Sequence, residues 1–114
     1  GYGGTQRLPK LVGKGFANEL ILSAKMIPAQ RATEIGLVNE VFSLEDLLSK
    51  TKELATLISQ NSPLGIAKAI AAVNLAYTNK GFETEIKSFG ELFEMEDKKE
   101  GVAAFLEKRK PSFN

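Results

Sequence analysis

The chain has 114 residues and a formal net charge of +1, from 15 basic and 14 acidic side chains. This length suits one domain with a hydrophobic core, and the balanced charge gives no field that would by itself recruit nucleic acid or an anionic membrane. Because the chain has neither histidine nor cysteine, it cannot by itself build a Ser-His-Asp triad, a thiol nucleophile or a zinc site.

A glycine cluster opens the sequence: Gly1, Gly3 and Gly4 are followed by Thr-Gln-Arg-Leu at residues 5–8. Glycine tolerates the left-handed torsions of a tight bend, so the cluster predicts a turn that leads into a helix. It does not complete a phosphate-binding pattern, because no Gly-Lys-Ser/Thr sequence follows. Two interpretations of the glycine cluster are open: its backbone approaches a ligand closely, or the glycines only make a turn.

Two helices are expected in the first third of the chain. Apolar residues recur at helical spacing from residue 14 to 24, after a break at Gly13. A shorter helix is expected over residues 29–35, with Gly36 at its end. The apolar stretch at residues 37–42, rich in β-branched and aromatic side chains, predicts a strand or an extended segment.

Four further helices are expected after residue 43. Ser43 and Asp46 resemble a capping box at the start of the first. Asn-Ser-Pro at residues 61–63 should end that helix and cap the next one, because serine is a good N-cap and proline suits the first helical position. We expect Gly81 to end this second helix, whose apolar side runs from Ile66 to Tyr77.

The last two helices are marked by a phenylalanine-rich stripe and by a second capping signature. Apolar residues at positions 82, 86, 89 and 93 follow helical spacing. Asp97 with Glu100 predicts the start of the final helix, which gives way to a basic run at residues 108–110. The chain is therefore predicted to be mainly α.

The order of these signals resembles that of the crotonase superfamily, in particular the enoyl-CoA hydratases. Four segments carry the resemblance, and they span almost the whole chain: residues 3–13, 32–41, 61–63 and 97–111. One departure is Pro28, which stands where family members usually carry serine or threonine as a helix cap. The resemblance implies the C-terminal helical part of the crotonase-like α/β spiral fold.

A reaction on an acyl-CoA thioester is implied by the same resemblance. In this family backbone amides stabilise the enolate-like oxygen, and in hydratases two glutamates move protons as water adds across the α,β double bond. The matching amides and glutamates are expected upstream of Gly1. The acidic residues of the chain read instead as solvated helix or loop positions; they include Glu19, Glu34, Glu40, Glu53, Glu91, Glu94, Glu96 and Asp97.

Three positions match functional residues of the family. Gly1 matches a glycine whose backbone amide helps to hold the reacting water in hydratases. Phe105 and Lys108 match positions that contact coenzyme A bound to a neighbouring subunit, near its adenine and phosphate. From the pattern alone, Phe105 could equally pack in a core or interface with Val102, and Lys108 could serve only the helix dipole.

The resemblance also divides the chain into two parts. Residues 1–43 match the end of the crotonase core, and residues 44–114 match a helical module that covers the active site and builds trimers or hexamers. The implied partners are an acyl-CoA thioester and further copies of the chain, with no nucleic acid, membrane, metal or separate cofactor; coenzyme A is part of the substrate. Because cysteine is absent, we expect a cytoplasmic protein.

Three functions remain open at this point. The first is the C-terminal part of an enoyl-CoA hydratase, and the second is another acyl-CoA enzyme of the superfamily, such as an enoyl-CoA isomerase. The third applies to these 114 residues alone, which could act as a non-catalytic module for oligomerisation or coenzyme A contact.

Overall fold

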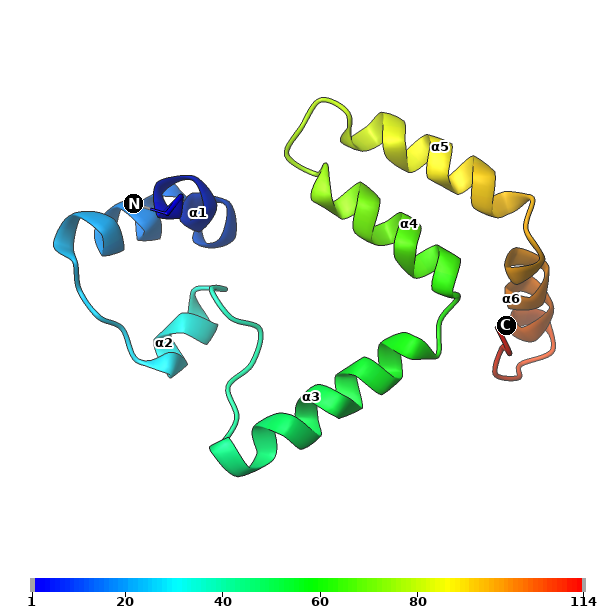
Figure 1. Cartoon of the computed structure of the whole chain (residues 1–114), viewed down its shortest axis with the longest axis horizontal. Coiled ribbons are helices and arrows are strands. Elements are labelled where there is room, and N and C mark those ends of the chain that lie inside the picture. The colour runs from blue at the N-terminus through cyan, green and yellow to red at the C-terminus, as the bar shows by residue number, and fades with distance from the viewer. Residues whose placement is uncertain (1, 114) are drawn as a thin grey trace. The chain divides into compact units, whose positions relative to one another are not determined.

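The computed structural model describes residues 2–113, and within them all regular structure is helical (Figure 1). The mainly α prediction is confirmed. No helix in this part of the chain is long and apolar enough to cross a membrane. The chain divides into two compact units, residues 1–50 and 51–114. The helices are α1 (Gly4–Ser23), α2 (Ala29–Glu34), α3 (Leu44–Ser59), α4 (Pro63–Asn74), α5 (Gly81–Phe93) and α6 (Glu96–Leu106).

Helix α1 begins and bends at glycines. Gly3 precedes it with φ 87°, and its carbonyl accepts hydrogen bonds from the amides of Gln6 (3.1 Å) and Arg7 (3.0 Å). Inside α1, Gly13 has φ 77° and ψ 161°, a conformation that other residues essentially do not adopt. The predicted glycine turn and the predicted break at Gly13 are therefore both confirmed.

The first unit has a small apolar core. Val12 and Ala17 lie on either side of the break in α1, and both are buried against Ile35 at the end of α2. Burying apolar surface in this way is what stabilises helices too short to persist alone. Partly buried side chains complete the cluster; they are Leu8, Leu20, Ile27 and Leu37.

Residues 37–42 do not form a strand. Of the two predicted alternatives, a strand or an extended segment, the strand is wrong. The amides of Leu37 and Val38 both donate to the Ala32 carbonyl, at 2.8 and 3.4 Å, and so close the end of α2. A strand needs a neighbouring strand to receive its backbone hydrogen bonds, and none exists within residues 2–113. The apolar side chains here were a sign of packing, as Leu37 shows.

Serine caps begin two helices as the sequence predicted. At α3 the Ser43 hydroxyl accepts a hydrogen bond from the Asp46 amide at 3.1 Å and donates to the Asp46 carboxylate at 2.8 Å. At α4 the Ser62 hydroxyl accepts from the Gly65 amide at 3.0 Å, with Pro63 as the first helical residue. Each hydroxyl satisfies an amide that the helix itself leaves unpaired.

Gly81 begins α5; the prediction that it ends the preceding helix is wrong. Helix α4 stops at Asn74, and the Leu75 carbonyl accepts from the Thr78 amide at 2.9 Å in the turn that follows. Tyr77 therefore lies outside the helix. This turn brings α4 and α5 side by side (Figure 1), and the Lys68 ammonium pairs with the Glu91 carboxylate between them.

The start of α6 also differs from its prediction. Met95 is the N-cap residue and makes no side-chain cap. The Asp97 carboxylate accepts a hydrogen bond from the Ser62 hydroxyl, and the Glu100 carboxylate binds the end of the chain. Neither acidic side chain therefore forms the predicted capping box, because each has a partner distant in sequence.

Candidate functional site

Of the three predicted site residues, Gly1 lies outside the residues that the structure describes. The other two, Phe105 and Lys108, lie at the C-terminal end of α6. Phe105 is in the last turn of the helix, and Lys108 follows it in a left-handed conformation with φ 53°. The structure thus places one aromatic ring and one ammonium group at the same helix end.

Two backbone hydrogen bonds close this end of the helix. The Arg109 amide donates to the Ala104 carbonyl at 3.0 Å, and the Lys108 amide donates to the Phe105 carbonyl at 3.3 Å. With Lys108 left-handed, these are the two bonds of a Schellman motif, in which glycine is the usual residue at the left-handed position. Lysine at that position costs backbone energy, so other contacts must help to hold the conformation.

Phe105 and Lys108 are both exposed. The ring of Phe105 is 82% exposed, so it does not pack in the core of its own unit. Within residues 2–113 no carboxylate forms an ion pair with the Lys108 ammonium. An exposed ring and an available ammonium group at one helix end have the chemistry to contact a flat heterocycle and a phosphate.

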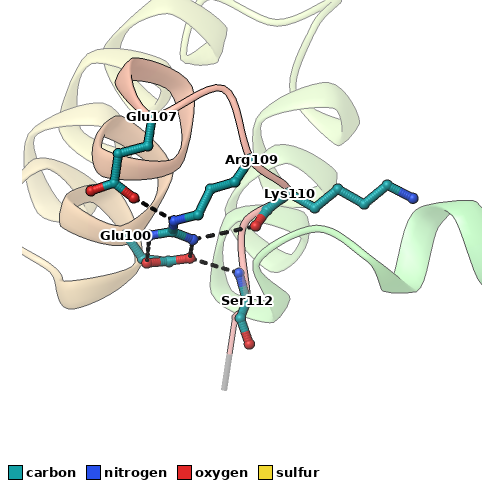
Figure 2. A network of polar contacts seen from close by, with 5 residues as sticks. All are labelled: Glu100, Glu107, Arg109, Lys110 and Ser112. Atoms are coloured by element: carbon teal, nitrogen blue, oxygen red, sulfur yellow. Dashed lines mark hydrogen bonds and ion pairs between the residues drawn. The ribbon is translucent and has the colours of Figure 1, made fainter.

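The carboxylate of Glu100 binds two residues of the segment after Lys108 (Figure 2). The Arg109 guanidinium donates to both oxygens of Glu100, at 2.6 and 2.9 Å, and the Ser112 amide donates to the Glu100 Oε1 atom at 2.7 Å. Arg109 also donates to the Glu107 carboxylate at 2.6 Å and to the Lys110 carbonyl at 3.3 Å. We call the contacts among Glu100, Arg109 and Ser112 the tail clamp.

The tail clamp is charge-assisted. Hydrogen bonds from the Arg109 side chain, followed by the bond from the Ser112 amide, lower the pKa of Glu100 to about 2. Hydrogen bonds to Glu100 and then to Glu107 raise the pKa of Arg109 further above its ordinary value. A bidentate arginine–carboxylate pair is both stronger and more directional than a single neutral hydrogen bond. Glu100 is therefore ionised at neutral pH.

A separate hollow of about 520 Å³ lies between α4 and α5. Its wall is mainly apolar, and one of its polar residues is Lys68, which pairs with Glu91. Hydrogen bonding and charge from Lys68 lower the pKa of Glu91. Glu91, which the sequence suggested was simply solvated, therefore joins two helices. Apolar and aromatic residues of the wall include Ala69, Ala72, Val73, Phe82, Phe89 and Leu92.

Comparison with known proteins identifies the family. The sequence model described as enoyl-CoA hydratase/isomerase matches residues 1–114. The chain belongs to the enoyl-CoA hydratase/isomerase family. The resemblance to crotonases is thereby confirmed.

Curated members of the enoyl-CoA hydratase/isomerase family are similar over nearly the whole chain. A crotonyl-CoA hydratase of Syntrophomonas wolfei is 43% identical over 116 residues, which cover 99% of this chain and 45% of that protein. A short-chain-enoyl-CoA hydratase of Clostridium acetobutylicum is 44% identical over 115 residues, covering 96% of this chain and 43% of that protein. The chain thus spans less than half the length of these curated relatives.

A solved structure in the family matches nearly the whole chain. The crystal structure of enoyl-CoA hydratase from Bacillus anthracis matches with a TM-score of 0.88 and 38% identity, over 99% of this chain and 45% of that chain. At this identity and TM-score the helical fold described above is that of a crotonase C-terminal part. This confirms the predicted fold class.

The sequence interpretation missed the roles of Glu100 and Arg109. The sequence analysis interpreted Glu100 as part of a helix start, and Arg109 as one residue of a basic run after the helix. The two residues are separated by the left-handed turn at Lys108, so no helical spacing connects them. The only sequence signal was the basic run at the predicted end of the helix, which did not single out Arg109.

Proposed function

We propose that this chain is the C-terminal portion of an enoyl-CoA hydratase, which adds water across the α,β double bond of an enoyl-CoA thioester in fatty-acid or related acyl-CoA metabolism. The observation that carries the proposal for this chain is the end of α6, where an exposed Phe105 is in the last turn and a left-handed Lys108 follows the helix. The names of the relatives from Syntrophomonas and Clostridium support hydration of a short enoyl-CoA.

In the proposed enzyme this chain binds the nucleotide part of the substrate and leaves bond-making to residues outside it. The Phe105 ring packs against the adenine, and the Lys108 ammonium pairs with a phosphate of coenzyme A bound to a neighbouring subunit. The backbone amide of Gly1 assists in holding the reacting water. The glutamates that move protons and the amides that stabilise the thioester oxygen would lie upstream.

Steady-state hydration of crotonyl-CoA by the full-length protein tests the proposal. We expect turnover by that protein and none by the 114-residue chain alone. Lys108→Ala in the full-length protein should raise KM about tenfold with kcat unchanged, since the lost contact is made equally in the ground and transition states. With crotonyl-pantetheine, which lacks the nucleotide, the same variant should behave as wild type.

Lys110→Ala is the matched control for Lys108→Ala. Lys110 is a nearby exposed cation, and Figure 2 shows its side chain extending away from the tail clamp. It should leave KM for crotonyl-CoA nearly unchanged. An equal rise in KM for both variants would mean that only the general positive charge of the tail matters, and no change for Lys108→Ala would refute its contact with coenzyme A.

The family description also includes isomerases, so isomerisation of a 3-enoyl-CoA is the second candidate activity. Assaying the full-length protein with a 2-enoyl-CoA and a 3-enoyl-CoA separates the two reactions. Conversion of the 3-enoyl substrate without hydration of crotonyl-CoA would replace hydratase by isomerase. The contacts proposed for Phe105 and Lys108 involve only the coenzyme A portion, which the two substrates share.

For the chain alone we propose a role in assembly. The stripe of α5 is largely exposed, with Phe82, Ile86 and Phe89 each more than two-thirds accessible. Exposed apolar surface of this kind favours contact with another protein surface, and the full-length protein is proposed to be a trimer or hexamer. Light scattering that shows a well-dispersed monomer of the chain would count against self-association. The cytoplasmic location stays a prediction.

A further inference from the structure

We propose that Glu100 is a positioning residue for Lys108: through Arg109 and the Ser112 amide it holds the end of the chain so that the Lys108 ammonium stands where coenzyme A is bound. This inference rests on the proposed contact between Lys108 and coenzyme A. It assigns a function to Glu100, which contacts neither the substrate nor the Lys108 side chain directly. It also predicts whether substitution of Glu100 weakens or strengthens coenzyme A binding.

The position of Glu100 in the fold is the first argument. It lies within α6, close to Ala104, which is buried. From this helix its carboxylate accepts hydrogen bonds from Arg109 and from the Ser112 amide, nine and twelve residues further along the chain. A residue on a packed helix therefore fixes a segment that has no regular structure of its own.

Lys108 lies inside the loop that the tail clamp closes. Its φ of 53° is one that lysine seldom adopts, and an unconstrained chain would favour negative φ. The Arg109 amide donates to the Ala104 carbonyl, and the Arg109 guanidinium donates to Glu100 as well as to Glu107. Because φ sets the direction of the Cα–Cβ bond, release of Arg109 would redirect the Lys108 side chain.

Charge makes the inference distinguishable from simple electrostatic attraction. Replacing Glu100 by a neutral side chain removes a negative charge and leaves the Arg109 guanidinium with Glu107 as its one carboxylate partner within the described residues, so attraction of an anion to the tail would increase. Positioning predicts the reverse, because the ammonium of Lys108 would no longer be held in the productive place. The two explanations therefore give opposite changes in affinity for the same substitution.

Titration of free coenzyme A into the full-length protein by calorimetry tests the sign. We expect Glu100→Gln to weaken binding about three- to tenfold, which is the loss of part of one charged contact. Glu107→Gln removes the same charge and another partner of Arg109, but leaves both bonds to Glu100 and that to Ser112; it should leave binding unchanged or tighter. Unchanged or tighter binding in Glu100→Gln would overturn the proposal.

A double-mutant cycle shows whether Glu100 acts through Lys108. In a Lys108→Ala background, Glu100→Gln should have little further effect on coenzyme A affinity, since the group that it positions is gone. An equal loss in both backgrounds would overturn the proposal. If Glu100→Gln does not fold, Arg109→Lys serves as the second variant, because it keeps the positive charge but loses the bidentate geometry. We expect Arg109→Lys to weaken coenzyme A binding as well.

Amide hydrogen exchange separates failure of this inference from failure of the proposed function. In Glu100→Gln, the amides of Arg109 and Ser112 should exchange faster than in wild type while those of α4 keep their rates. If Lys108→Ala leaves coenzyme A affinity unchanged, the proposed contact between Lys108 and coenzyme A is refuted. This holds even if hydrogen exchange in Glu100→Gln confirms the tail clamp. Wild-type exchange at both amides in Glu100→Gln would overturn the tail clamp itself.

Discussion

The Ser62 hydroxyl, which caps α4, donates a hydrogen bond to the Asp97 carboxylate in the first turn of α6. The same hydroxyl oxygen accepts the Gly65 amide at 3.0 Å. One side chain thus both starts a helix and connects it to another helix 35 residues away in sequence. The cap is local chemistry that the sequence predicts, whereas the connection to α6 exists only in the folded chain.

Removing this hydroxyl should destabilise the second unit. For Ser62→Ala we expect the free energy of unfolding to fall by about 1 kcal/mol, the usual cost of a lost N-cap, and further because Asp97 loses its partner. Urea unfolding followed by circular dichroism measures the change. Ser59→Ala is the control, since that exposed hydroxyl donates only to the Thr56 carbonyl at 2.9 Å. Equal losses for the two variants would contradict a special role for Ser62.

Gly81 should not tolerate a side chain. A Cβ atom there would lie 2.9 Å from the Leu75 carbonyl oxygen, so Gly81→Ala must shift the backbone of the α4–α5 turn. We expect a loss of about 1–3 kcal/mol in unfolding free energy. Gly90→Ala is the matched control, because no atom lies within 4 Å of its Cβ position and alanine favours the helix by about 0.5–1 kcal/mol. A stabilising Gly81→Ala would refute the close approach.

Lys108→Gly should separate stability from binding. Glycine relieves a left-handed strain of about 1–2 kcal/mol but loses about 0.5–1 kcal/mol through its larger unfolded-state entropy. Thermal unfolding should therefore show a small net stabilisation, while coenzyme A affinity falls as for Lys108→Ala. Ala24→Gly is the control, since Ala24 is also left-handed, with φ 50°, at the end of α1. It should gain similar stability with unchanged affinity.

The tail clamp should open in acid. Because the folded state lowers the pKa of Glu100 from 4.5 to about 2, its stabilising contribution is complete above about pH 4.5 and is lost as the pH falls through about 2. Carboxyl resonances followed by NMR should give a midpoint near 2 for Glu100. The Ser112 amide resonance should move with it. In Glu100→Gln this dependence of the Ser112 resonance should disappear, and a midpoint near 4.5 in wild type would contradict the tail clamp.

Several elements followed from local sequence signals alone. Glycine at residues 3 and 13, and serine at residues 43 and 62, produced the turn, the break and the two caps where expected. These features depend on one residue and its immediate neighbours, so they do not need the rest of the fold. The order of the same signals also indicated the family that comparison then identified.

Other positions were decided only by tertiary contacts. Residues 37–42 have the composition of a strand, yet a strand requires a neighbour that these residues lack within the described chain. Asp97 and Glu100 have the spacing of a capping box, but Ser62 and Arg109 provide stronger partners once the chain has folded. For Asp97 and Glu100, a partner distant in sequence replaced the local capping partner that the pattern implied.

The sequence by itself determined the helical content, most helix starts and the family, because backbone preferences, caps and motif order act over a few residues. Only the tertiary structure decided that Glu100 closes the end of the chain around a left-handed Lys108. The reason is geometric: a carboxylate can meet residues nine and twelve positions later only after the helix has ended and the chain has turned back.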